Sequence, residues 1–325
     1  MTEGKVVIAG ATGLVGRALV KKLLTNGYAI AVVSRSPASA MGALTGVQEV
    51  CEWPSGEAST FNKFIDGAVA VINLAGESLF PGRLSAARYK RAMETRIQSV
   101  RILTSAILAA KKRPAAFLVG SSVGIYGFPE VSSEVVTETT LDGLDHHARS
   151  NAIWEHAAAP AAAGGVRTVF LRTGIVWGAD GGMFAGQFGQ FSRGWGSNVG
   201  SGQGWLPWIH VDDEVAMIAF LLARTDLSGP FNLSAPDPIR YTDYATMLGE
   251  ITQKRLRKPM PEFVLRAMMG MTADMVIRNR RMIPQRATES GYKFVFPGAK
   301  EALMDLARRT GAPESFKQHL AHMAR

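Results

Sequence analysis

Short apolar runs alternate with longer amphipathic segments along the first half of the chain. Five apolar runs occur at 6–9, 29–33, 69–74, 116–119 and 166–171. Most are separated by segments with helical spacing, such as 17–25, which ends at Asn26-Gly27, and 86–110, in which Ile97, Val100 and Leu103 recur every three residues. Strands that alternate with helices predict a parallel, doubly wound α/β sheet.

The first apolar run leads directly into the glycine-rich segment Gly10-Ala11-Thr12-Gly13-Leu14-Val15-Gly16. A buried strand, a glycine turn and a helix form the layout of a dinucleotide-binding βαβ unit, although here the glycines are spaced three and three. Gly10 permits a tight turn, Gly13 lets the backbone approach a pyrophosphate, and Gly16 lets the helix pack on the strand. The residues expected to bind the cofactor here are Gly10, Thr12, Gly13, Leu14, Val15 and Gly16.

The end of the second predicted strand indicates which dinucleotide binds. That strand is followed by Ser34-Arg35-Ser36, where an Asp or Glu would normally bind a free ribose 2′-OH. A guanidinium with hydroxyls on either side suits a 2′-phosphate, because arginine binds phosphate through two charge-assisted hydrogen bonds. We therefore predict NADP(H) rather than NAD, bound by Ser34 and Arg35. The alternative is that Arg35 is a solvated loop residue.

The pattern changes after residue 171. Residues 179–204 are rich in glycine and phenylalanine, and the segment from 236 onward is mostly helical in pattern but interrupted by prolines. We predict a Rossmann domain over 1–178, to which 211–234 return, and a smaller, mostly helical C-terminal substrate domain over 179–210 and 235–325. Ligands of such sheets bind at the carboxyl ends of the strands, so the cleft between the two parts is the expected site.

Composition narrows the classes of partner. The chain has 325 residues, 47% of them hydrophobic, and a net charge of +9 that is spread along the sequence. This fits an anionic small-molecule ligand and a solvated surface, and it argues against a nucleic-acid partner. No apolar run is long enough to span a membrane, no signal peptide is apparent, and Cys51 is the only cysteine. We expect a cytoplasmic monomer or homodimer with no metal site.

Further motifs resemble those of the extended short-chain dehydrogenase/reductase superfamily. They are Asn73-Leu74-Ala75-Gly76, Ser121-Ser122-Val123-Gly124-Ile125-Tyr126-Gly127, the segment 171–178 and the segment 208–213. Trp154-Glu155, Gly200-Ser201-Gly202 and Arg281-Met282-Ile283-Pro284 are similar to an atypical branch, the NAD-dependent epimerase-like family, whose members carry a C-terminal extension. The resemblance covers essentially the whole chain and implies nicotinamide-cofactor binding. The further cofactor-binding residues that it implies are Leu74, Ala75, Gly76, Arg96, Gly120 and Ser121.

Enzymes of that superfamily transfer a proton with a tyrosine and a lysine four residues later, which share one helix face. This chain has no tyrosine between Tyr126 and Tyr241 and no lysine between Lys112 and Lys254. On the helix expected over 145–163, alignment on Glu155 places His147 at the tyrosine position and Asn151 at the lysine position. We predict Ser122, Tyr126 and His147 as catalytic residues. Ser122 would orient the substrate; Tyr126 is either a substitute acid or a packing residue, and His147 either a proton donor or a surface residue.

For the other charged residues, two interpretations stay open. Glu77, Arg96 and Arg172 either line the cleft or form buried ion pairs. His210 with Asp212 and Asp213 suggests a metal site only superficially. We expect a structural role there, with Asp212 capping the helix that follows.

Three functions fit the sequence. The first is an NADP-dependent oxidoreductase or epimerase-like enzyme that acts on a small polar substrate with a non-standard proton donor. The second is a non-catalytic NADP(H)-binding sensor or binding module. The third is a nucleotide-sugar epimerase or dehydratase, which the missing Tyr/Lys pair weakens because both reactions require efficient oxidation of an alcohol.

Overall fold

The computed structural model describes residues 3–53, 58–79, 82–128 and 133–310. Among these residues, seven strands form a parallel sheet in the order β12-β7-β5-β4-β1-β2-β3. The predicted doubly wound Rossmann sheet is thus confirmed. Its strands are β1 (Lys5–Ala9), β2 (Ala29–Ser34), β3 (Glu49–Glu52), β4 (Ala70–Asn73), β5 (Ala116–Ser122), β7 (Arg167–Thr173) and β12 (Gly229–Leu233).

Helices cover both faces of the sheet, because successive residues of each strand point to opposite sides. In β1, Val6 and Ile8 pack on one side with α1 (Leu14–Thr25), α2 (Pro37–Ala43) and α8 (Val211–Ala223). Val7 and Ala9 pack on the other side. The helices there are α3 (Ala58–Ile65), α4 (Ala86–Ala109), α5 (His146–His156) and α6 (Ala159–Ala163).

The helix predicted over 145–163 is two helices in the structure. Asp145 caps α5 by accepting a hydrogen bond from the Ala148 N–H, and α5 ends at His156. Pro160 lies in the first turn of α6, where its missing N–H is tolerated, whereas it could not continue α5. The prediction of one continuous helix was therefore wrong, although its first part was placed correctly.

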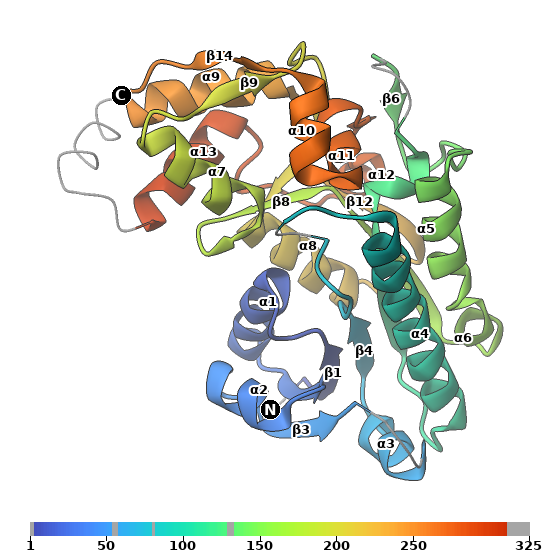
Figure 1. Ribbon diagram of the computed structural model, residues 1–325. Coiled ribbons are helices and arrows are strands. Elements are labelled where there is room, and N and C mark those ends of the chain that lie inside the picture. Colours follow the sequence, from blue (N-terminus) through green and yellow to red (C-terminus); the bar gives the residue numbers. More distant parts are fainter. Residues whose placement is uncertain (1–2, 54–57, 80–81, 129–132, 311–325) are drawn as a thin grey trace.

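The second part of the molecule mixes helices with short strands around its own core. In the upper part of Figure 1 lie α7 (Gly182–Ser192), α9 (Tyr241–Thr252), α10 (Glu262–Met269) and α13 (Ala299–Arg309). Trp177 and Trp208 stack at the centre of this core with ring centroids 4.5 Å apart. The remaining elements are β6 (Val135–Val136), η1 (Val123–Tyr126), β8 (Ile175–Gly178), β9 (Ser197–Val199), β10 (Trp205–Leu206), β11 (Trp208–His210), β13 (Ile239–Arg240), β14 (Arg257–Met260), η2 (Met271–Ala273), α11 (Asp274–Ile277), β15 (Arg281–Met282) and α12 (Gln285–Glu289).

The segment from α12 to Phe296 returns to the sheet and contacts both the sheet domain and the second part of the molecule. Helix α12 packs against β12, and Tyr292 belongs to the hydrophobic cluster of the first part. The fully buried carboxylate of Asp213 accepts hydrogen bonds from Tyr292 Oη and from the N–H groups of Val295 and Phe296. The segment that contains Tyr292 thus also packs on the sheet, while the division of the chain into two domains stays a prediction. Residues 311–325 of the expected second domain lie outside the described residues.

The segment around His210 has a structural role. His210, rather than the expected Asp212, caps α8: its Nδ1 accepts a hydrogen bond from the Asp212 N–H. Asp212 instead forms an ion pair with Arg309 at 2.7 Å. Within the described part of the chain, no group of His, Cys, Asp and Glu side chains is arranged to hold a metal ion.

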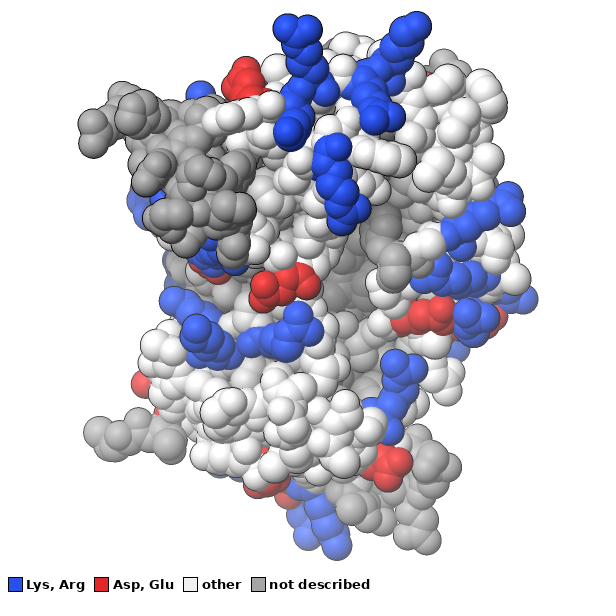
Figure 2. All heavy atoms as spheres, turned by 60° about the vertical axis from the view of Figure 1, so that its left-hand side comes forward, with Lys and Arg blue, Asp and Glu red and all other residues white. Residues whose placement is uncertain are grey.

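The surface charge is distributed rather than concentrated. Lys and Arg side chains form several separate groups on the face shown in Figure 2, with Asp and Glu side chains near some of them. Among the helices of the described residues, none is long and apolar enough to cross a membrane.

Candidate active site

A cavity of about 370 Å³ lies at the carboxyl ends of β1, β2 and β4. Eight of the predicted cofactor-binding residues line it, namely Gly10, Thr12, Gly13, Ser34, Arg35, Leu74, Ala75 and Gly76. We call this space the cofactor cavity. Parallel strands that end at one edge of a sheet bring these three separate sequence segments together.

Two glycines of the loop cannot be replaced without moving the backbone. Gly10 has a φ of +83°, and a Cβ there would lie 2.5 Å from the carbonyl carbon of Leu74. A Cβ at Gly16 would overlap the carbonyl oxygen of Gly10. Gly13, by contrast, has an extended backbone at the N-cap of α1, and the nearest atom to a Cβ there would be 3.5 Å away. The absent side chain at Gly13 therefore keeps space open beside the helix N-terminus rather than relieving strain.

Four predicted cofactor residues line neither the cofactor cavity nor the cavity next to it, namely Leu14, Val15, Gly16 and Gly120. Leu14 packs against the β8–α7 turn, where a Cβ at Gly178 would lie 2.8 Å from its Cδ1. Val15 packs against the hydrophobic core on the side of the sheet that α1 covers. Gly120 allows close approach of strands, since a Cβ there would lie 3.0 Å from the Asn73 carbonyl oxygen. These three residues, like Gly16, shape the walls of the site without facing it.

The cofactor cavity has a positive end and a neutralised acidic end. Arg35 is exposed at the end of β2 and forms no hydrogen bond or ion pair within the described part of the chain. Glu77 lies at the other end and is paired with Arg91 at 2.9 Å and Arg88 at 3.6 Å, contacts that lower the pKa of its carboxyl. The lining residues that sequence reasoning missed include Trp53, Thr95, Gln98 and Ser99.

Asn73 holds the 74–76 loop in place along this cavity. Its Oδ1 accepts a hydrogen bond from the Ala75 N–H at 3.0 Å, and its Nδ2 donates to Ser99 Oγ at 2.9 Å. An asparagine at the end of β4 thus links the strand to helix α4. This contact gives the N-x-A-G sequence motif a physical basis.

A second cavity, of about 190 Å³, lies next to the first, and we call it the substrate cavity. It is lined by the ends of β5 and β7, by one face each of α4 and α5, and by η1 at Gly124. Leu79, Phe128 and Met275 complete the lining. Arg96 and Ser121, predicted to bind the cofactor, line this cavity instead. Arg96 stands between the two spaces, because its Nη1 donates to the carbonyl of Glu77, which lines the cofactor cavity.

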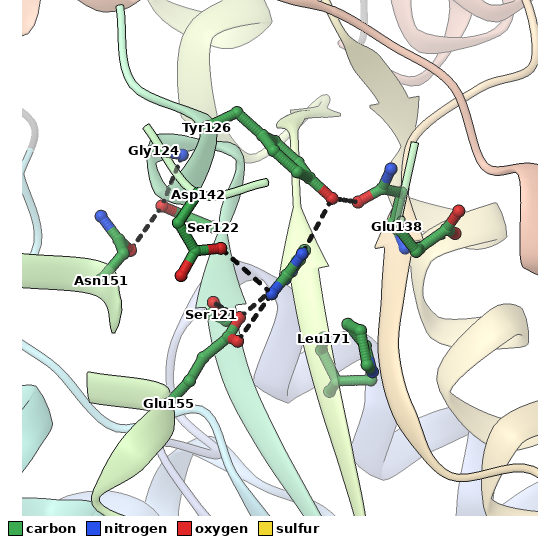
Figure 3. A network of polar contacts seen from close by, with 12 residues as sticks. Ser121, Ser122, Gly124, Tyr126, Glu138, Asp142, Asn151, Glu155 and Leu171 are labelled. Atoms are coloured by element: carbon green, nitrogen blue, oxygen red, sulfur yellow. Dashed lines mark hydrogen bonds and ion pairs between the residues drawn. The ribbon is translucent and has the colours of Figure 1, made fainter. Parts of the chain in front are cut away.

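Ser122 and Asn151 form the polar floor of the substrate cavity. Figure 3 shows Ser122 Oγ, which donates to Asn151 Oδ1 at 2.9 Å and accepts from the Gly124 N–H at 3.1 Å. Asn151 Nδ2 in turn donates to the His147 carbonyl oxygen at 2.8 Å. Asn151, which the alignment on Glu155 predicts at the lysine position, therefore orients the serine hydroxyl.

His147 is buried in the wall of the same cavity, so the surface alternative for this residue is wrong. Tyr89 and Phe128 pack edge-on against the imidazole with centroids 4.9 Å away, and Nε2 has no hydrogen-bond partner within the described part of the chain. Burial lowers the pKa of His147 to about 4, helped by the neighbouring charge of His146. The ring is consequently neutral at pH 7.

Tyr126 lies in a buried network behind the cavity. Its hydroxyl donates to Asn232 Oδ1 at 2.7 Å and accepts from Arg172 Nη1 at 3.1 Å (Figure 3). Burial raises the pKa of Tyr126 to about 12, and the side chain lines neither cavity. This placement favours the packing role of Tyr126 over proton transfer.

Arg172 is the centre of that network. Its Nε and Nη2 bind the two carboxylate oxygens of Glu155 at 2.9 Å each, and Ser121 Oγ donates to Glu155 at 2.6 Å. Of the two roles expected for Arg172, the structure therefore shows the buried ion pair. The pair ties helix α5 to strands β5 and β7 and so fixes the position of His147 and Asn151.

Glu214 is a buried acid that sequence reasoning missed. Its Oε1 accepts a hydrogen bond from Thr173 Oγ1 at 2.9 Å, while its Oε2 has no partner within the described part of the chain. Burial raises the pKa of Glu214 to about 8. Thr173 lines the substrate cavity, so a carboxyl that stays protonated at neutral pH lies directly behind that wall.

Comparisons with known proteins agree with this architecture. The sequence model of the NAD dependent epimerase/dehydratase family matches residues 6–234, and that of a domain of unknown function (DUF1731) matches 260–306. The Arabidopsis thaliana "Epimerase family protein SDR39U1 homolog, chloroplastic" is 32% identical over 92% of this chain and 85% of its own. The Mycobacterium bovis "Epimerase family protein Mb2239" is 31% identical over 96% of this chain and 100% of its own.

Solved structures show the same fold. The crystal structure of human epimerase family protein SDR39U1 (isoform 2) with NADPH has a TM-score of 0.82 and 26% identity, over 94% of this chain and 99% of that one. A Thermotoga maritima UDP-glucose 4-epimerase solved with UDP-glucose has a TM-score of 0.75 at 20% identity, over 95% and 100% of the two chains. The second likeness concerns the fold alone. Since one relative is named chloroplastic, a cytoplasmic location for this chain stays a prediction.

Proposed function

The chain belongs to the NAD dependent epimerase/dehydratase family, as its motifs predicted, and we propose that it is an NADP(H)-dependent oxidoreductase acting on a small polar substrate. The observation that carries this proposal is the adjacency of the two cavities. A dinucleotide held in the first would place its reactive end beside the second, where Ser122, Asn151 and His147 come together. The motif that contains Ser122 and the alignment on Glu155 predict these residues at the positions of the superfamily's catalytic groups.

The residues of the cofactor cavity fit NADP(H). The N–H groups at the start of α1 face open space at Gly13, which suits a pyrophosphate. Arg35 has no partner among the described residues and lies where the 2′-phosphate of such a cofactor is expected. The human relative, whose structure contains NADPH, supports the same choice.

When bound, reduced nicotinamide would supply a hydride to a carbonyl carbon. The protein then has to stabilise the negative charge on the carbonyl oxygen and allow that oxygen to receive a proton. Ser122 can turn its hydroxyl proton from Asn151 towards that oxygen. His147 can donate a hydrogen bond from Nε2, but being neutral at pH 7 it has no extra proton to give. The final proton then comes from water, and we expect slow turnover for this reason.

The substrate cavity argues against a nucleotide sugar. Its volume of about 190 Å³ lies below the roughly 300–1,000 Å³ typical of pockets that enclose a drug-sized ligand. We therefore favour a small carbonyl compound or its alcohol.

A non-catalytic NADP(H) sensor is the second candidate. It is favoured by the neutral His147 and by Asn151, which cannot lower the pKa of a phenol as a lysine ammonium does.

Two measurements test these functions together. Calorimetric titration of the full chain with NADP⁺ and NAD⁺ should show tighter binding of NADP⁺; equal or tighter NAD⁺ binding would refute the cofactor assignment. Loss of reduced-nicotinamide absorbance is then followed with a panel of small carbonyl compounds. A panel of sugar nucleotides is followed by chromatography of the products, because an epimerase or dehydratase regenerates its cofactor in each cycle and leaves that absorbance unchanged. Turnover of a small carbonyl supports the oxidoreductase, and turnover of a sugar nucleotide supports the epimerase or dehydratase. Tight cofactor binding without any turnover supports the sensor.

A further inference from the structure

Arg96 is a partly buried cation that forms no ion pair within the described part of the chain. It is the only residue with a charged side chain at neutral pH among the described residues that line the substrate cavity. Its Nη1 donates to the backbone carbonyls of Glu77 and Ala92 at 2.8 and 2.9 Å, and no carboxylate lies within ion-pair distance. Burial lowers the pKa of Arg96 to about 10. Arg172, by contrast, is paired with Glu155 through two hydrogen bonds.

Three further polar groups of residues in the cavity wall lack hydrogen-bond partners within the described part of the chain, namely Tyr89 Oη, Trp154 Nε1 and His147 Nε2. Trp154 and His147 are both buried, and both residues lie on α5. Buried polar groups are normally satisfied, and an indole N–H can only donate. The Arg96 guanidinium lies 5.5 Å from the Trp154 ring, so the cation and this unused donor belong to the same wall.

The other polar groups of the cavity do not supply an anion. The hydroxyl protons of Ser121 and Ser122 point to Glu155 and Asn151, and neither Asp nor Glu lines the cavity. The cavity thus offers a positive charge and free hydrogen-bond donors, which together are complementary to a small anion.

We propose that the substrate cavity recognises a short oxo acid, with its carboxylate at Arg96 and Trp154 and its carbonyl at Ser122 and His147. The inference rests on the proposed oxidoreductase function, which requires the carbonyl; the unpaired cation adds the carboxylate. One guanidinium and one indole N–H match the single charge and two oxygens of a carboxylate. A phosphate ester carries nearly two negative charges and would need more cations than this cavity has.

The test measures binding separately from turnover. The full chain, saturated with NADP⁺, is titrated with pyruvate, acetoacetate and levulinate, which differ in the distance between carbonyl and carboxylate, and with their neutral methyl esters. We expect at least one acid to bind about tenfold or more tightly than its own ester. We expect Arg96→Gln to remove this preference and Arg96→Lys, which keeps the charge, to retain part of it. Arg101→Gln alters an exposed arginine of the same helix and should behave like the wild type.

The outcomes separate this inference from the proposed function. Acids that bind no better than esters, or no acid binding at all, would overturn the inference. So would an Arg96→Gln variant that weakens NADP⁺ and leaves the acid-to-ester ratio unchanged, since Arg96 would then serve the cofactor. An acid that binds with the expected preference but is not reduced by NADPH overturns the oxidoreductase and leaves the inference standing. Esters that are reduced as fast as their acids would overturn the inference and leave the oxidoreductase standing. Retention of the preference in a folded Arg96→Lys variant shows that its loss in Arg96→Gln is not a folding defect.

Discussion

The cofactor cavity and the substrate cavity differ in whether main chain or side chains form most of their walls. The first is made largely of main chain, with strand ends and a glycine loop that exclude side chains at Gly10 and Gly16. The second is made of side chains from several elements, positioned by the network around Arg172 and Glu155. Main-chain geometry depends on a few residue types at fixed spacing, whereas a side-chain site can exchange its residues while the backbone stays the same. A cofactor cavity of familiar design can therefore coexist with a neighbouring cavity of unfamiliar composition.

This difference predicts separable losses of function. Changes in the glycine loop should abolish cofactor binding, and changes in the substrate cavity should alter chemistry while the cofactor still binds. A variant that fails in both respects would show that the two cavities are not independent.

The largest expected effect is that of Gly13→Asp on cofactor affinity. The new carboxylate would occupy the space expected for the pyrophosphate, and we expect a loss on the order of a thousandfold, about 4 kcal/mol. Because Gly13 is the N-cap of α1 and has no close neighbour at a Cβ, stability should be unchanged or slightly higher. Calorimetric titration with NADP⁺ and a thermal melt measure the two quantities.

Gly16→Ala is the matched contrast within the same loop. Its Cβ would collide with the Gly10 carbonyl, so we expect lost stability rather than selectively lost binding. Unchanged NADP⁺ affinity in a folded Gly13→Asp protein would contradict the assignment of the cofactor cavity.

The next effect is that of Ser122→Ala on hydride transfer. Removing a hydrogen-bond donor at the oxygen where charge develops typically costs about a hundredfold or more in rate. Since the neutral His147 contributes only a hydrogen bond, we expect His147→Ala to cost less. Single-turnover kinetics with NADPH and a substrate identified in the carbonyl panel measure both rates. If His147→Ala abolishes transfer and Ser122→Ala does not, the acid/base arrangement differs from the one described here.

Arg35→Ala should have a smaller and selective effect. We expect NADP⁺ binding to weaken by about 2 kcal/mol, roughly thirtyfold, because a charged hydrogen-bond partner of the 2′-phosphate is removed. NAD⁺ binding should hardly change, and the exposed Arg101→Ala on α4 should alter neither. Equal weakening of both cofactors would show that Arg35 does not discriminate between them.

Much of the fold and of the cofactor cavity could be predicted because local signals agree with the tertiary structure there. Strand-like runs, the glycine spacing and Ser34-Arg35 each depend on residues close in sequence, and they meet where parallel strands end. The substrate cavity was predicted less completely. Trp154 and Tyr89 face the same space only because α4 packs against α5, and a single sequence does not show that contact.

The sequence could not decide the surroundings of Tyr126, Arg172 and Arg96, for definite physical reasons. The network of Tyr126 and Arg172 includes Asn232, which is more than a hundred residues from Tyr126 in sequence. No local pattern indicates that the tyrosine hydroxyl is already engaged. Similarly, the resemblance implied that Arg96 binds the cofactor, but its side chain lines the neighbouring cavity. In both cases the deciding contacts link distant segments.

The smallest expected effect is a pH dependence of stability that comes from His147. Because its pKa falls from an ordinary value of 6.5 to about 4 on folding, the unfolded chain binds more protons between these values, and stability should decrease as the pH falls through that window. Asp145 and Asp274 oppose this shift, but burial and His146 outweigh them. We expect His147→Phe, whose ring suits the aromatic slot between Tyr89 and Phe128, to lose about 1 kcal/mol less than the wild type between about pH 6 and about pH 5. Urea unfolding at both pH values measures this, with the exposed His156→Phe of the same helix as control. An identical acid slope in wild type and His147→Phe would mean that the imidazole is not held neutral by its surroundings, and the substrate cavity would then contain a second cation beside Arg96.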